Sequence, residues 1–194
     1  MTPMATHVAL LRGINVGGRN KVAMADLREV VAELGHADVS TYIQSGNVLF
    51  TPGAGDAGTS ALAAALAEAI RTRLGVTAPV VVVSRDELAE VIGANPFPDE
   101  ADPKRVHAVL LSGALGADAA GKIDEALARS AAKGARDELA IVGRTIYLHT
   151  PDGFGNSELA AAVLRIVTSP RAGVTGTARN WATTLKLLDL CGDG

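Results

Sequence analysis

Cysteine, aromatic residues and long apolar runs are scarce in this chain of 194 residues. A single cysteine, Cys191, cannot form a disulfide within the chain, which argues against a disulfide-stabilised secreted protein. The sequence holds no apolar stretch of about 18 residues, so it predicts no transmembrane helix. Met1–His7 lacks a basic region followed by an apolar one, so we expect no signal peptide and a cytoplasmic location.

An excess of positive charge is also missing. The chain has 18 Lys and Arg against 21 Asp and Glu, and its net charge is -3. A protein that binds duplex DNA over a broad surface shows a basic footprint instead, although a local basic patch is compatible with this balance. Hydrophobic residues make up 48% of the chain, which predicts a globular protein with a packed core.

Metal-binding and hydrolase motifs are absent from the sequence. The four histidines are far apart and follow no metal-ligand spacing. No Gly-x-Ser-x-Gly motif is present. We therefore expect neither a bound metal nor a cofactor, and no catalytic residue can be named.

The order of predicted elements repeats about 97 residues along the chain, although the residues themselves hardly repeat. Apolar periodicity and turn residues predict the elements of the first half: strands 7–11, 39–43, 48–50 and 80–83, helices 24–34 and 62–74, and a short helix after Ser84. The second half is predicted to hold strands 106–111, 139–142, 145–149 and 173–175, helices 117–127 and 157–167, and a final helix 181–191. A segment rich in proline separates the halves, so we expect domains at residues 1–94 and 105–194 with a linker at 95–104.

A strand-helix-strand-strand-helix-strand unit is the ferredoxin-like motif. We therefore predict an α+β protein with two ferredoxin-like plaits in tandem, each followed by an extra helix. Val8–Leu11, Val80–Val83 and Val106–Leu111 carry apolar residues of both parities. Strands of this kind are usually buried on both faces. We expect the open sheet faces to be covered, either by each other or in a homo-oligomer.

The best candidate for a site is the loop 12–21, which joins a predicted strand to a predicted helix. Glycine-rich turns can direct backbone N–H groups inward, and a helix N-terminus adds positive potential, so such a loop can hold an anion. The loop matches neither the P-loop nor the dinucleotide-binding fingerprint. The alternative is a structural loop with solvated cations. The candidate anion-binding residues are Arg12, Asn15, Gly17, Gly18, Arg19, Asn20 and Lys21.

The predicted hairpin turn at residues 42–47 is a secondary candidate. Gln44, Ser45 and Asn47 could bind a polar ligand, but they are also ordinary turn residues. We expect the first and third strands of a plait to run parallel. That arrangement would place this turn at the opposite end of the sheet from the loop 12–21, so the two motifs would not form one site within one domain.

A third group of candidates surrounds the predicted final helix. Arg179 and Asn180 precede this helix, where Arg179 could form an ion pair or contact an anion. Trp181 starts an apolar stripe, which favours a core position over a stacking platform, and Lys186 is a secondary candidate. We expect a partner for the loop 12–21 to come from the linker, the second plait or another subunit, with Arg179 as the first choice.

Several motifs resemble a widespread bacterial family known as domain of unknown function 1697. They are the segments 8–18, 42–48, 95–97, 177–181 and 185–187. The resemblance implies a fold of two ferredoxin-like plaits but supplies no activity, substrate or catalytic residue. The family typically has Ser-Lys-Leu where this chain has Ser157, Glu158 and Leu159, so an anion contact by that lysine would be absent here.

Three functions compete at this point. The first is a module that binds a phosphate-bearing or other anionic ligand, either a nucleotide or a single-stranded nucleic acid, through the loop 12–21. The second is an enzyme that acts on a small anionic substrate, with Arg12 and Arg179 as charge stabilisers. The third is a structural or protein-interaction role. We favour the first and expect no membrane partner.

Overall fold

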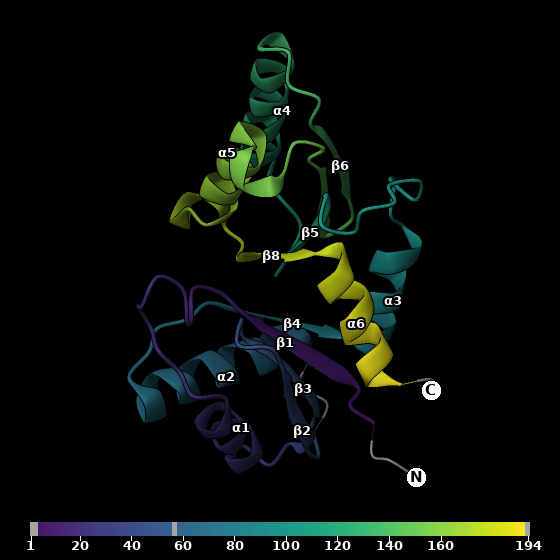
Figure 1. The fold of residues 1–194 in the computed structure, drawn as a ribbon. Coiled ribbons are helices and arrows are strands. Elements are labelled where there is room, and N and C mark those ends of the chain that lie inside the picture. The colour runs from purple at the N-terminus through teal and green to yellow at the C-terminus, as the bar shows by residue number, and fades with distance from the viewer. Residues whose placement is uncertain (1–3, 56–57, 193–194) are drawn as a thin grey trace. The chain divides into compact units, whose positions relative to one another are not determined.

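The computed structural model describes residues 4–55 and 58–192. It shows an α+β protein with two four-stranded antiparallel sheets, each built from a β-α-β-β-α-β segment (Figure 1). The strand orders are β2-β3-β1-β4 and β6-β7-β5-β8, and an additional helix follows each segment. The fold class predicted from the sequence is therefore confirmed. Residues 1–3 of the segment examined for a signal peptide lie outside the described residues.

The chain divides into two compact units. The first unit comprises the chain up to Ala89 together with the segment from Lys186, and the second comprises Glu90–Leu185. Each boundary falls inside a helix: one within α3 (Arg85–Gly93) and the other within α6 (Trp181–Cys191).

In the first unit, two helices cover one face of the sheet. Leu27 and Val30 of α1 and Leu66 and Ile70 of α2 share a buried cluster with the strand residues on that face, Phe50 among them. Figure 1 shows both helices on the same side of the strands. The elements are β1 (His7–Leu11), α1 (Met24–Glu33), β2 (Ala37–Tyr42), β3 (Asn47–Thr51), α2 (Thr59–Leu74) and β4 (Val80–Ser84).

Local sequence signals fix the ends of two of these helices. Gly75 ends α2 in the left-handed conformation, with a φ of 67°, which glycine adopts without steric cost. At the start of α3, the Ser84 hydroxyl accepts a hydrogen bond from the Glu87 N–H, and the Glu87 carboxylate accepts one from the Ser84 N–H. This reciprocal pair is a capping box, and the short helix that the sequence predicts after Ser84 is confirmed.

The second unit repeats the arrangement, with one correction to the prediction. The last strand is β8 (Gly176–Asn180), not 173–175, because Pro170–Ala172 forms a short 3-10 turn and Gly173 is left-handed, with a φ of 68°. The chain becomes extended only after that turn, where β8 pairs with β5. The other elements are β5 (Val106–Leu111), α4 (Ala117–Ala132), β6 (Glu138–Val142), β7 (Thr145–His149), a 3-10 turn (Phe154–Asn156) and α5 (Glu158–Val167).

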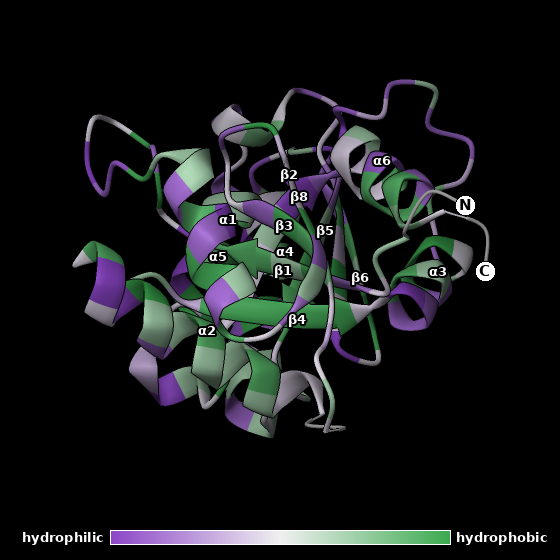
Figure 2. Cartoon of the chain, turned by 90° about the horizontal axis from the view of Figure 1, so that it is seen from below, coloured by the Kyte–Doolittle hydropathy of each residue, from purple (hydrophilic) through white to green (hydrophobic). Residues whose placement is uncertain are grey.

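Residues of both parities are buried in the strands that the sequence predicts to be buried on both faces. Val8, Ala9, Leu10 and Leu11 of β1 are each at most 1% exposed, and β4 and β5 follow the same pattern. Figure 2 shows β4 as a largely apolar strand, whereas the helices alternate apolar with polar residues. Within the described part of the chain, no helix is both long and apolar enough to cross a membrane.

Candidate anion-binding site

The loop 12–21 is a closed structure organised by Asn15. The Asn15 side-chain amide donates to the carbonyl oxygens of Val22 and Gln44, both at 3.0 Å, and its Oδ1 accepts from the Val22 N–H at 2.9 Å. The Asn15 N–H also donates to the Asn20 carbonyl, and the Asn20 side chain donates to the Gly13 carbonyl. The two asparagine amides therefore hold the loop in shape.

Left-handed residues allow the loop to close on itself. Gly17 and Gly18 have φ values of 58° and 75°, and Asn15 and Asn20 also have positive φ values. Glycine adopts this region without strain, and asparagine is among the residues that tolerate it best. The side chains of Arg19 and Lys21 project from this closed loop as exposed cations.

The hairpin turn lies beside the loop, contrary to the sequence-based expectation. β1 and β3 run antiparallel, with Leu10 opposite Asn47, so the end of β1 and the start of β3 meet at the same end of the sheet. The Leu11 N–H donates to the Gly46 carbonyl at 2.8 Å, and Asn15 donates to Gln44. The expectation was wrong because it gave these strands the same direction, and the two motifs lie side by side.

A shallow hollow of about 350 Å³ lies where the loop, the hairpin turn and the N-terminus of α1 come together. The N-cap residue of α1, Ala23, supplies no side-chain cap to the helix. The N–H groups of the first turn of α1 are therefore open to another acceptor. The hollow is lined by Asn15, Gly18, Lys21, Val22, Ala23 and Gln44.

Other predicted residues have structural tasks in the geometry. Asn47 is fully buried and its amide donates to the Tyr42 carbonyl and to the Ser45 hydroxyl. Asn180 Oδ1 accepts from the Thr183 N–H at 2.8 Å, which makes it the N-cap of α6. Trp181 lies against the Tyr147 ring, with 6.3 Å between ring centroids.

Arg12, Arg179 and Lys186 are the remaining predicted cations. Burial lowers the pKa of both arginines, and it lowers that of Arg179 to about 10, so Arg179 stays charged at neutral pH. Arg179 donates to the Thr177 hydroxyl and to the Ala178 carbonyl, both at 2.9 Å. Lys186 forms an ion pair with Asp189. Arg12 and Arg179 belong to different compact units, and their pairing stays a prediction.

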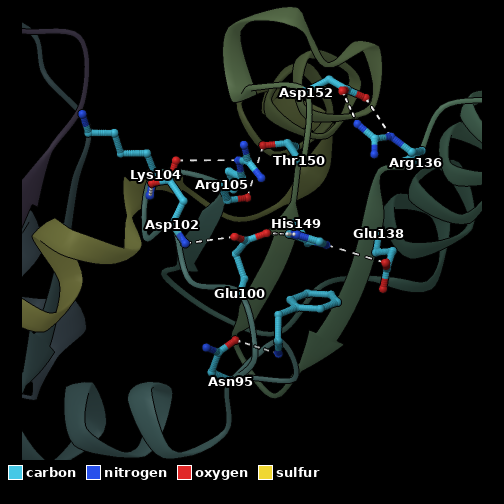
Figure 3. A network of polar contacts seen from close by, with 11 residues as sticks. Asn95, Glu100, Asp102, Lys104, Arg105, Arg136, Glu138, His149, Thr150 and Asp152 are labelled. Atoms are coloured by element: carbon cyan, nitrogen blue, oxygen red, sulfur yellow. Dashed lines mark hydrogen bonds and ion pairs between the residues drawn. The ribbon is translucent and has the colours of Figure 1, made fainter.

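A second polar cluster fastens the segment 95–105 to the sheet of its own unit (Figure 3). Glu100 Oε2 lies 2.7 Å from His149 Nε2, and Glu100 Oε1 accepts from the Asp102 N–H. These two contacts lower the pKa of Glu100, the backbone one most. The Phe97 ring packs on the His149 ring, with 5.3 Å between centroids. Both oxygens of the Glu100 carboxylate are thus engaged, whereas the buried His149 Nδ1 has no hydrogen-bond partner and lies 3.6 Å from Glu138 Oε1. The contacts between the segment and the sheet favour a structural role for this cluster.

Glu158, the residue that departs from the family's usual lysine, has a partner in the structure. Its carboxylate lies 2.5 Å from Lys133 Nζ, and it occupies the first turn of α5, where a negative charge is favourable. Among the described residues, no group of three or more His, Cys, Asp or Glu side chains is placed to hold a metal ion.

Comparison with known proteins places the chain in a family. The profile of a family described as protein of unknown function (DUF1697) matches residues 4–147, and the chain belongs to this family. Conserved bacterial protein SP0830 from Streptococcus pneumoniae has a similar structure, with a TM-score of 0.60 and 26% sequence identity over 97% of this chain and 99% of that one. No curated protein matches the sequence.

Sequence reasoning named the loop and the hairpin turn but missed Val22 and Ala23 as parts of the same site. Val22 takes part through its backbone N–H and carbonyl, and Ala23 through its position at the helix N-terminus. Neither contribution depends on side-chain chemistry, so no residue-type signal could have found them.

Proposed function

We propose that this protein binds a small anionic ligand bearing a phosphate group in the hollow at the N-terminus of α1. The observation that supports this proposal is that Lys21, Gly18 and Gln44 line the same hollow as the uncapped N-terminus of α1. Unsatisfied N–H groups and the positive end of the helix dipole attract phosphate, and a lysine adds a full charge.

The geometry supports a division of roles within the loop. The side-chain amides of Asn15 and Asn20 are engaged in holding the loop. The ligand contacts therefore come from Lys21, the Gln44 side chain and the backbone N–H groups near Gly18, which line the hollow. Gln44 is exposed, and its carbonyl is fixed by Asn15. The residue before it, Ile43, has a φ of 51°, a costly conformation for a β-branched residue that persists only where the surrounding contacts impose it.

A small ligand fits this hollow better than a nucleic acid. Its volume of about 350 Å³ is at the lower end of the range for small-molecule sites. Proteins that bind single-stranded nucleic acid stack bases on aromatic rings, and none of the residues that line this hollow is aromatic. The preferred ligand class is therefore a nucleotide or another small phosphate compound.

Phosphate titration of the full chain, followed by amide NMR, tests the proposal. Inorganic phosphate and pyrophosphate should give saturable shifts at Gly18, Lys21 and Ala23. Lys21→Gln should weaken binding about tenfold, because it removes a charge-assisted contact. Lys104→Gln removes the same charge from an exposed lysine outside the hollow and should leave binding unchanged. Shifts that chloride reproduces at equal ionic strength, or an affinity for phosphate that is unchanged in Lys21→Gln, would refute the proposal.

A further inference from the structure

Three cations meet at a second hollow, in the Glu90–Leu185 unit. Lys122 of α4, Arg165 of α5 and Arg171 of the 170–172 turn line this hollow, which has a volume of about 300 Å³. One carboxylate, Asp118, is also part of the lining, so the charged residues of the hollow sum to a net charge of +2. The whole chain, in contrast, has a net charge of -3.

In the described structure, no ion pair links these three cations to a carboxylate, whereas Arg129 and Lys133 nearby each have one. Asp118 precedes Lys122 by one helical turn, a spacing that permits an ion pair, yet none forms between them in the described structure. The neighbouring hollow of about 270 Å³ gives the contrast. There, Arg129 lies 3.7 Å from Glu125, and Lys133 pairs with Glu158.

Local structure brings the three exposed side chains to the lining of one hollow. α4 and α5 pack together, which brings Lys122 and Arg165 to the same surface. Arg171 follows Pro170 in a short 3-10 turn. The Arg171 N–H donates to the Ser169 hydroxyl, and Gly173 ends the turn in the left-handed conformation. α4 begins at Ala117, and its N-cap residue, Gly116, supplies no side-chain cap. The N–H groups of its first turn, at Asp118 and Ala119, therefore add positive potential.

We propose that this hollow is a second anion site, which binds a small phosphate ester. The phosphate contacts Lys122, Arg165 and Arg171, since two guanidinium groups and an ammonium group match its charge and its acceptor oxygens. The organic part lies on the apolar portion of the lining, formed by Ala119, Ile166 and Ala172. This site is independent of the hollow at α1.

The choice of a small ester over a polyanion follows from the surroundings. Arg165 lines both hollows, and the other two cations of the neighbouring hollow, Arg129 and Lys133, are engaged in ion pairs. A nucleic-acid strand would need a continuous basic track and stacking surfaces. No aromatic residue lines either hollow.

The test uses the full chain with three probes: inorganic phosphate, glycerol 3-phosphate and an oligothymidine, each against chloride at equal ionic strength. Amides at Lys122, Ser169 and Arg171 should shift saturably with phosphate, and more tightly with glycerol 3-phosphate. The double variant R165Q/R171Q should bind at least about tenfold more weakly. R129Q changes the same kind of charge in the neighbouring hollow and should differ by less than about twofold.

Each alternative result has a defined meaning. Equal binding by R165Q/R171Q and the parent chain overturns the site, as does an identical response to chloride. If oligothymidine binds more tightly than glycerol 3-phosphate, and R129Q also weakens the binding of oligothymidine, the surface is an extended polyanion-binding surface and the proposal is wrong. K21Q should leave the shifts at Lys122, Ser169 and Arg171 unchanged. The experiment therefore distinguishes a lack of binding at the hollow of α1 from a lack of binding at this second hollow.

Discussion

Gly46 offers a quantitative test of how the hairpin turn is seated against the loop. It is buried, with a φ of 85°, and a Cβ added there would lie 2.8 Å from Leu11 Cβ and 3.1 Å from Ile14 Cδ1. The left-handed conformation costs a residue with a Cβ about 1–2 kcal/mol, and overpacking costs about 1–3 kcal/mol more. Since Leu11 belongs to the central strand β1, it cannot move away easily. Gly46→Ala should therefore lower the free energy of unfolding by about 2–5 kcal/mol.

Gly17→Ala is the matched control, because Gly17 also has a positive φ, 58°, but nothing lies within 4 Å of an added Cβ. It should cost only the conformational part, about 1–2 kcal/mol. Urea unfolding followed by circular dichroism measures both variants, and amide hydrogen exchange in β1 and β3 localises the effect. Equal losses in the two variants would show that Gly46 is not packed against Leu11 and Ile14, and the reasoning would fail.

Three further predictions concern single side chains. Desolvation lowers the pKa of His107 from 6.5 to about 4. Because the pKa is lower in the folded than in the unfolded chain, neutral His107 contributes its full stabilisation above about pH 6.5. This stabilisation, at most roughly 3 kcal/mol, is lost as the pH falls toward 4. His107→Phe should flatten this pH dependence, and an imidazole NMR titration near 6.5 would contradict it. Asn15→Gly keeps the backbone conformation but removes three side-chain hydrogen bonds, so it should cost about 2–4 kcal/mol and weaken phosphate binding at α1; an unchanged melting temperature would argue against Asn15 as the organiser of the loop. Tyr147→Phe removes the 2.6 Å hydrogen bond to the Val91 carbonyl and should cost about 1 kcal/mol in thermal unfolding without changing phosphate binding at either hollow.

Local patterns were enough to predict most of the fold. The apolar spacing of Leu27, Val30 and Val31 marks the buried face of α1, and Gly75 and the Ser84–Glu87 pair mark helix ends. These signals depend on interactions within a few residues, so they can be read from the chain. The strand at 176–180 was misplaced because Gly-Thr-Ala-Arg-Asn contains few residues with strong strand preference, and its pairing with β5 decides its conformation.

The candidate site was predicted only in part. Its glycines and cations were visible as a motif, but the place of the hairpin turn depended on strand direction, which is a property of the whole sheet. Asn15 and Asn20 were predicted as ligand contacts, whereas the structure occupies their amides with the loop itself. Side-chain identity alone does not distinguish a donor that holds a loop from one that is available to a ligand.

The sequence by itself determined the repeated order of strands and helices, the loop at the end of β1 and the lack of a metal-ligand motif. The tertiary structure decided which distant segments meet. Gln44 reaches the loop 12–21 because β3 runs antiparallel to β1, and Lys122, Arg165 and Arg171 share one hollow because α4 packs against α5. Backbone hydrogen bonding between strands and apolar packing between helices act across long sequence separations, so their outcome appears only in the folded chain.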